Sequence, residues 1–71
     1  MAMTFGKRLR IMRAVRSVTQ QDLGYACGIP RIKIIAAEAG WLPPEDMQAK
    51  LRYALDWTEL DDATMEALYH G

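Results

Sequence analysis

The sequence lacks the residue combinations on which most enzyme and metal sites depend. It contains one cysteine and one histidine, Cys27 and His70, so no internal disulfide can form. These two residues have neither the spacing nor the companions of a zinc site. There is no glycine-rich phosphate loop, no nucleophile beside a base and no pair of catalytic carboxylates. We therefore expect no enzyme, no metal and no cofactor, with Cys27 as a small buried apolar residue.

Long apolar runs are also missing. No run approaches the roughly 18 residues needed to cross a bilayer. The basic N-terminus is followed by no apolar stretch and no small-residue cleavage site, so we expect neither a secretion signal nor a membrane partner. A single cysteine suits a reducing cytoplasm.

The net charge of zero conceals a strong division of charge along the chain. Residues 1–36 have a net charge of +6, and residues 37–71 have a net charge of −6. One interpretation is a face built for a polyanion and a second face kept away from it. The alternative is the uneven charge that small helices often carry. Apart from Asp22, the charged residues of the first half are all basic: Lys7, Arg8, Arg10, Arg13, Arg16, Arg31 and Lys33.

The pattern of apolar residues predicts an all-α domain over residues 1–71, with five helices and no strand. Thr4 can cap the first helix, and Thr19 the second, which ends at Gly28. The third helix is expected to begin at Pro30, because the fixed φ and missing N–H of proline are harmless in a first turn. It is expected to stop at Gly40. A fourth helix is expected from about residue 45 to residue 56, and Thr58 or Asp61 caps a fifth.

Residues 19–40 form the most informative stretch of the chain. Two short helices joined by a glycine turn make a helix-turn-helix, which places its second helix in the DNA major groove. At 100° per residue, with Ile34 pointing inward, the outer face of that helix is apolar and flanked by two cations. The outward residues are Ile32, Ala36 and Ala39, with Ile35 nearby and with Arg31 and Lys33 at the sides.

Residues 5–55 resemble the lambdoid-phage Cro/repressor family of helix-turn-helix domains, often called the XRE family. The matching strings are FGKRLRIMR at the first helix and VTQQDL at the second, then Gly28-Ile29, Ile34, Glu38, Gly40 and Pro43. The resemblance implies a compact five-helix bundle with a small residue, Gly24, where the second and third helices cross. Its core would be Phe5, Leu9, Met12, Val18, Leu23, Cys27, Ile29, Ile34, Leu51 and Leu55.

The resemblance also implies a partly buried ion pair between Arg13 and Glu38, which would tie the first helix to the end of the third. Losing one partner of such a pair can cost about 3–5 kcal/mol, because a charge is left alone. The alternative is that the two residues are independent solvated charges.

For function, the resemblance implies a transcriptional regulator that binds double-stranded operator DNA as a homodimer. It would act by occupancy in the cytoplasm of a bacterium or a phage-infected host, as a phage regulator, a restriction-system controller or an antitoxin. The second helix would supply Gln20, which contacts a phosphate or braces the third helix, and Gln21. The expected DNA-contacting residues of the third helix are Arg31, Ile32, Lys33, Ile35 and Ala36.

The apolar face departs from the family pattern, because relatives usually carry amide, hydroxyl or guanidinium groups there. Isoleucine can only touch thymine methyl groups. Three interpretations remain open. The face binds DNA with help from Arg31, Lys33 and DNA shape; or it binds another protein, with Trp41 as a neighbouring anchor; or it is buried in an oligomer.

Two further surfaces are predicted. In the first helix, Arg8 and Arg16 could approach phosphates, whereas Lys7 and Arg10 are expected on a solvated face. Residues 57–71 are the expected dimerisation segment, placing two recognition helices about one DNA turn, roughly 34 Å, apart. Its interface residues would be Trp57, Leu60, Met65, Leu68 and Tyr69, the alternative being that Trp57 and Leu60 fold back onto the core.

Overall fold

The computed structural model describes residues 3–69, which form five α-helices and no strand. The helices are α1 (Phe5–Arg16), α2 (Gln20–Cys27), α3 (Arg31–Glu38), α4 (Glu45–Ala54) and α5 (Glu59–Tyr69). The expected all-α, five-helix fold is confirmed. His70 and the last residue of the expected dimerisation segment lie outside the described residues.

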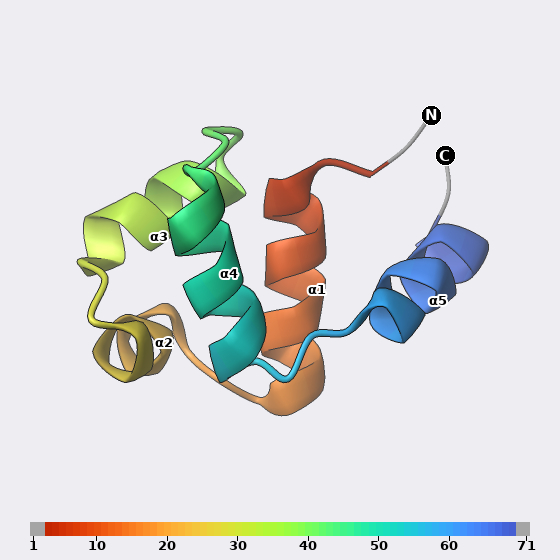
Figure 1. The fold of residues 1–71 in the computed structure, drawn as a ribbon, viewed down its shortest axis with the longest axis horizontal. Coiled ribbons are helices and arrows are strands. Elements are labelled where there is room, and N and C mark those ends of the chain that lie inside the picture. Colours follow the sequence, from red (N-terminus) through yellow and green to blue (C-terminus); the bar gives the residue numbers. More distant parts are fainter. Residues whose placement is uncertain (1–2, 70–71) are drawn as a thin grey trace.

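The helices are arranged along the longest axis of the molecule, which measures 31 Å. Figure 1 shows α2 and α3 at one end of this axis, α5 at the other end, and α1 and α4 between them. Contacts join α3 to both α1 and α2, and α2 to α4. The α2–α3 pair and α5 are therefore separate surfaces at opposite ends of the molecule.

Local capping signals determine where the helices begin and end. Thr4 Oγ1 accepts a hydrogen bond from the Lys7 N–H (3.2 Å), and Thr19 Oγ1 accepts one from the Asp22 N–H (3.0 Å). At α5 the cap is reciprocal: the Thr58 N–H donates to the Asp61 carboxylate (2.8 Å), and the Asp61 N–H donates to Thr58 Oγ1 (3.4 Å). All three predicted N-terminal caps are confirmed.

The predicted helix ends are less accurate. Gly28 ends α2 in the left-handed region (φ 67°), as expected. The fourth helix ends at Ala54, two residues earlier than predicted, and Asp56 has φ 49°. Ser17 ends α1 in the left-handed region (φ 57°), a conformation that a residue with a Cβ adopts less readily than glycine.

The core combines apolar residues from all five helices and the segments between them. Leu9, Leu23, Ile34, Leu51 and Leu55 are fully or almost fully buried. Phe5, Val18 and Cys27, which were expected in the core, are partly buried and pack against its edge. The buried core cluster within the described residues is Leu9, Met12, Leu23, Ile29, Ile34, Ala37, Leu51, Leu55, Trp57 and Met65.

Trp57 and Met65 belong to this core, with 5% and 3% of their surface exposed. For Trp57 the alternative, that it folds back onto the core, is confirmed, and for Met65 the predicted place in a dimer interface is wrong. The Trp57 ring stacks on Phe5 with 5.2 Å between ring centroids, and its indole N–H donates to Asp62 (2.8 Å). Because the Trp57 ring is packed and its N–H is hydrogen-bonded within the same chain, neither is available to a partner subunit.

Two glycines allow helices to approach closely. A Cβ on Gly24 would lie 2.7 Å from the carbonyl oxygen of Ile29, so α2 touches the turn before α3, as the resemblance implied. A Cβ on Gly6 would overlap the carbonyl oxygen of Ala37, so α1 crosses α3 with its backbone in direct contact. These contacts set the position of α3 relative to α1 and α2.

Candidate nucleic-acid interface

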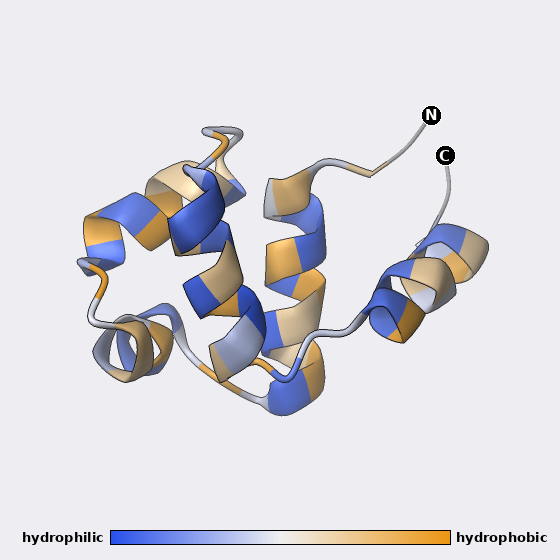
Figure 2. Ribbon diagram, viewed as in Figure 1, coloured by the Kyte–Doolittle hydropathy of each residue, from blue (hydrophilic) through white to orange (hydrophobic). Residues whose placement is uncertain are grey.

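The orientation of α3 follows from two buried residues. Ile34 and Ala37 are 0% and 1% exposed, and they fix one side of the helix against α1 and α2. Arg31, Ile32 and Lys33 are consequently exposed, as the helical spacing predicted. Figure 2 shows apolar and hydrophilic residues alternating along α3 and α5.

Ile32 is the most prominent apolar side chain of α3, at 72% exposed, against 43% for Ile35. Ala36 is half-buried, and its carbonyl oxygen accepts a hydrogen bond from the Trp41 N–H (2.9 Å). The exposed face of α3 therefore has Ile32 as its most exposed aliphatic group, with the less exposed Ile35 beside it and the cationic Arg31 and Lys33 at the sides. No acidic side chain belongs to α3 before Glu38, which points inward.

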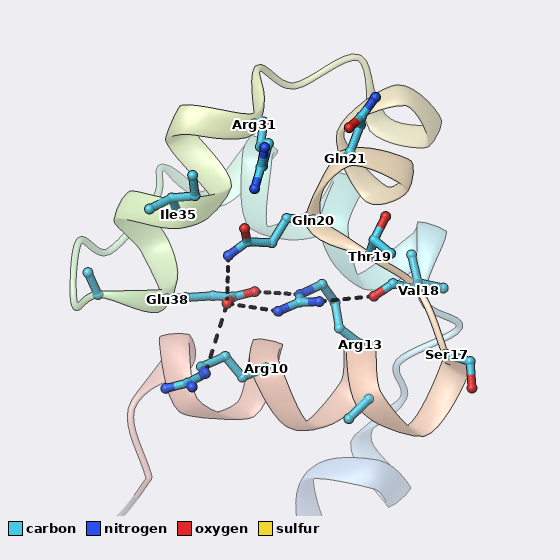
Figure 3. A pocket seen from close by; sticks show the side chains of 12 residues that line it. Arg10, Arg13, Ser17, Val18, Thr19, Gln20, Gln21, Arg31, Ile35 and Glu38 are labelled. Atoms are coloured by element: carbon cyan, nitrogen blue, oxygen red, sulfur yellow. Dashed lines mark hydrogen bonds and ion pairs between the residues drawn. The ribbon is translucent and has the colours of Figure 1, made fainter.

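A surface depression adjoins this face, between α1, the start of α2, and α3 (Figure 3). Two of its cations, Arg10 and Arg31, lie at its rim. The first backbone N–H groups of α2, those of Gln20 and Gln21, have no carbonyl partner inside their helix. Such groups, at the positive end of a helix, favour an anion. The full lining is Arg10, Arg13, Ala14, Ser17, Val18, Thr19, Gln20, Gln21, Arg31, Ile35, Glu38 and Ala39.

The floor of the depression is the predicted ion pair. Arg13 Nε and Nη2 donate to the two oxygens of Glu38 at 2.6 Å and 3.0 Å, and Arg13 Nη1 donates to the Val18 carbonyl (3.0 Å). The Glu38 side chain is only 7% exposed. The pair implied by the resemblance is therefore present, in the bidentate geometry that is strongest for arginine and carboxylate.

Gln20 completes this network. Its amide Nε2 donates to Glu38 (3.1 Å), and Figure 3 shows the side chain between Arg31 and Glu38. Of the two roles expected for Gln20, the structure shows the bracing of α3. Gln21 is exposed on the next position of α2, with its amide 3.4 Å from the Tyr25 hydroxyl. The network links α1, α2 and α3 at the base of the exposed face.

Two arginines of α1 that were expected near phosphates are engaged elsewhere. Arg8 pairs with Asp62 (2.9 Å) and with Glu66, both on α5. Arg16 donates to the backbone carbonyls of Leu55 (2.9 Å) and Asp56 (3.1 Å). Both guanidinium groups bind the C-terminal third of the chain, which leaves them less available to a phosphate than the sequence suggested.

The cations that remain beside the depression and α3 are therefore fewer than the sequence suggested. Arg10 is 68% exposed, with its Nε 4.0 Å from Glu38. Within residues 3–69, no carboxylate lies in ion-pair range of Lys7, Arg31 or Lys33. Arg31 and Lys33 can both reach a ligand that covers α3.

Asp62 is the centre of a second network that sequence reasoning missed. Its carboxylate accepts hydrogen bonds from Arg8 (2.9 Å), Arg52 (2.9 Å) and the Trp57 indole (2.8 Å). The Arg52 guanidinium also lies 4.3 Å from the centre of the Trp57 ring. Burial alone would raise the Asp62 pKa, but these three hydrogen bonds outweigh burial and lower it. The network docks α5 onto α1 and α4.

The outer side of α5 carries what remains of the predicted interface. Leu60, Leu68 and Tyr69 are 75%, 69% and 53% exposed. Among the acidic residues of α5, Asp61, Asp62 and Glu66 lie in ion-pair range of arginines from α1 and α4. The outer side of α5 therefore presents exposed leucines, while three acids of the same helix are paired on the side that faces α1 and α4.

Other chemistry is sparse in residues 3–69. Within that range no three histidine, cysteine or acidic side chains are gathered so as to hold a metal ion. The Cys27 thiol is half-buried and donates to the Lys50 carbonyl (3.6 Å). Burial raises the pKa of this thiol, while the charge of Lys50 acts in the opposite direction. None of the helices described is both long and apolar enough to cross a membrane.

No family model, curated protein or solved structure matches this chain. The resemblance to the Cro/repressor family stays a hypothesis that rests on the residues quoted above.

Proposed function

We propose that this protein is a sequence-specific, double-stranded-DNA-binding transcriptional regulator, with α2 and α3 as its helix-turn-helix. The observation that carries the proposal is the exposed face of α3. This face has cations, has no acidic side chain, and is held at a fixed angle by the Arg13–Glu38 pair. The adjoining depression offers Arg10 and two free N–H groups at the start of α2 to a phosphate.

A helix such as α3 can enter the major groove. An α-helix with its side chains is about 10–12 Å in diameter, and the major groove, about 12 Å wide, admits it. With α3 in the groove, the start of α2 would face the sugar-phosphate backbone beside it. Arg31 is at the first position of α3, where side chains reach base edges in helix-turn-helix proteins.

We further propose that the protein acts as a homodimer through the outer side of α5. Leu60, Leu68 and Tyr69 would form the contact, without Trp57 and Met65, which are buried. Because most acids of α5 are paired with arginines of the same chain, two copies can approach without strong repulsion. A two-fold symmetric pair would then recognise a two-fold symmetric operator.

A second candidate function is the binding of another protein through the same face. The exposure of Ile32 favours it, as does that of Trp41 (42%) and Leu42 (65%) in the segment after α3. Large exposed apolar groups are typical anchors of protein interfaces. Salt distinguishes the candidates, because binding driven by phosphates falls steeply as salt rises and an apolar contact barely changes.

The experiment that tests the proposal is selection from a random pool of double-stranded DNA at about 0.15 M salt, with enrichment followed by sequencing. We expect a two-fold symmetric sequence. Replacing Arg31 with alanine should weaken binding to it by about 1–3 kcal/mol if Arg31 contacts a base. The matched control is Lys50→Ala, which removes one exposed charge on α4 and should leave specific binding nearly unchanged. Without an enriched sequence, the proposed DNA-binding function is wrong.

A further inference from the structure

The exposed face of α3 has an unusual composition for a surface that recognises bases. Its central group is Ile32, at 72% exposed, which has no hydrogen-bond donor or acceptor in its side chain. Its orientation is not adjustable, because Ile34 and Ala37 on the opposite side are fully buried. An aliphatic group is therefore held outward at the point where a recognition helix meets its ligand.

The charges around Ile32 indicate what kind of surface covers it. Arg31 and Lys33 flank it in sequence, and both are exposed. Arg10, Gln20 and Gln21 line the adjoining depression, and the first backbone N–H groups of a helix have no carbonyl partner within it. A ligand that fits must present anions at its edges and an apolar group at its centre. The major groove does so, because phosphates line both sides and the 5-methyl group of thymine projects from its floor.

We propose that Ile32 recognises the 5-methyl group of a pyrimidine in the major groove, and that the site accepts thymine and 5-methylcytosine alike. This inference rests on the proposed DNA binding by α3. Thymine presents the O4 acceptor at its groove edge, whereas cytosine presents the N4 donor. A side chain without polar atoms cannot distinguish these edges, so the methyl group alone decides affinity at this position.

The neighbouring residues support Ile32 rather than Ile35 as the contact. Ile35 lines the depression between the helices and is only 43% exposed, so it is turned toward the phosphate side. Ala36 lies one turn after Ile32 on the same side of α3. Its short side chain allows the helix backbone to come close to the groove floor, which brings the Ile32 side chain against the bases.

The test uses the DNA sequence enriched by the selection described above. One thymine in each half-site is replaced by uracil, which removes only the methyl group, and each position is tested in turn. At the contacted position we expect affinity to fall about fourfold per half-site, the equivalent of about 0.8 kcal/mol for one buried methyl group. Changing that pair to C·G should weaken binding similarly, and changing it to 5-methylcytosine·G should restore binding.

Two protein variants test whether the difference in affinity between thymine and uracil DNA comes from the Ile32 side chain. Because Ile32 is exposed, Ile32→Ala should fold normally, as circular dichroism can verify, and it should bind the thymine and uracil DNAs equally well. Ile35→Ala is the matched control and should keep the difference between the two DNAs. If Ile32→Ala keeps the difference and Ile35→Ala loses it, the assignment to Ile32 is overturned.

The outcomes separate this inference from the proposed function. Enrichment of a sequence whose thymines can all be replaced by uracil without loss would overturn methyl recognition and leave DNA binding intact. Failure to enrich any sequence would overturn both proposals and point to a protein partner on the apolar face. A fourfold loss that is rescued by 5-methylcytosine supports the inference.

Discussion

The ion pair beneath the depression allows a sharp prediction about stability. Glu38 is 7% exposed, whereas Arg13 is 20% exposed and keeps a hydrogen bond to the Val18 carbonyl. Removing the arginine strands a buried carboxylate, so Arg13→Met should lower the free energy of unfolding by about 3–5 kcal/mol. Glu38→Gln leaves the less buried charge and should cost about 1.5–3 kcal/mol, the range for hydrogen bonds to charged groups.

The variant that combines Arg13→Met with Glu38→Gln tests this reasoning. Once the carboxylate is gone, Arg13→Met no longer leaves a charge unpaired, so the combined loss should be smaller than the sum by about 0.5–3 kcal/mol. Domains of this size are stable by roughly 0.05–0.15 kcal/mol per residue, or about 4–11 kcal/mol for the whole chain. Arg13→Met therefore removes a large share of the total stability, and the loss is measurable.

Urea unfolding followed by circular dichroism measures all four members of this cycle. Arg10→Met is the matched control, because Arg10 is 68% exposed and only 4.0 Å from the same carboxylate. An exposed pair of this kind contributes about 0–1 kcal/mol. If Arg13→Met costs no more than Arg10→Met, or if the two changes in the pair are strictly additive, the reasoning from burial is refuted.

Three further predictions concern the packing of α1 and α5. Gly6→Ala places a methyl group against the Ala37 carbonyl and should destabilise by about 1–3 kcal/mol, lowering the melting temperature although alanine favours helix; an unchanged or higher melting temperature would contradict the close contact. The lowered Asp62 pKa means that its contribution is present above the usual pKa of 3.8 and is lost as pH falls through the lowered value. Asp62→Asn should therefore be less stable near neutral pH and lose less stability below about pH 4 than the parent does, as urea midpoints across that range would show. Leu68→Glu should shift the protein from dimer to monomer in sedimentation while circular dichroism stays unchanged; a dimer that persists would place the contact elsewhere.

Local signals in the sequence were sufficient to predict where the helices of the first half begin and end. Thr4, Thr19 and Gly28 act through residues three or four positions away, so their roles are visible without knowledge of the fold. The inward direction of Ile34 likewise follows from helical spacing. The Arg13–Glu38 pair spans 25 residues and could be expected only from the resemblance to a known family.

The contacts of α5 could not be predicted in this way. Arg8 and Asp62 are 54 residues apart, and nothing in the spacing of either helix indicates that they meet. α5 also has apolar residues on two sides, Met65 on one and Leu60 on the other. Periodicity shows that both sides are apolar, but only the path of the chain after α4 decides which is buried.

If the protein is the proposed DNA-binding dimer, the separation of α3 and α5 along the 31 Å axis links the spacing of the DNA half-sites to the surface that joins the subunits (Figure 1). Two recognition helices on one face of DNA must be spaced by whole turns, about 34 Å or a multiple of it. A contact along the flank of α5 would keep the two copies of α3 closer together, near one turn apart. A contact at the far tip of the long axis would place them farther apart, toward two turns. The number of base pairs between the centres of the half-sites, about 10 or about 20, would thus reveal which surface of α5 joins the subunits.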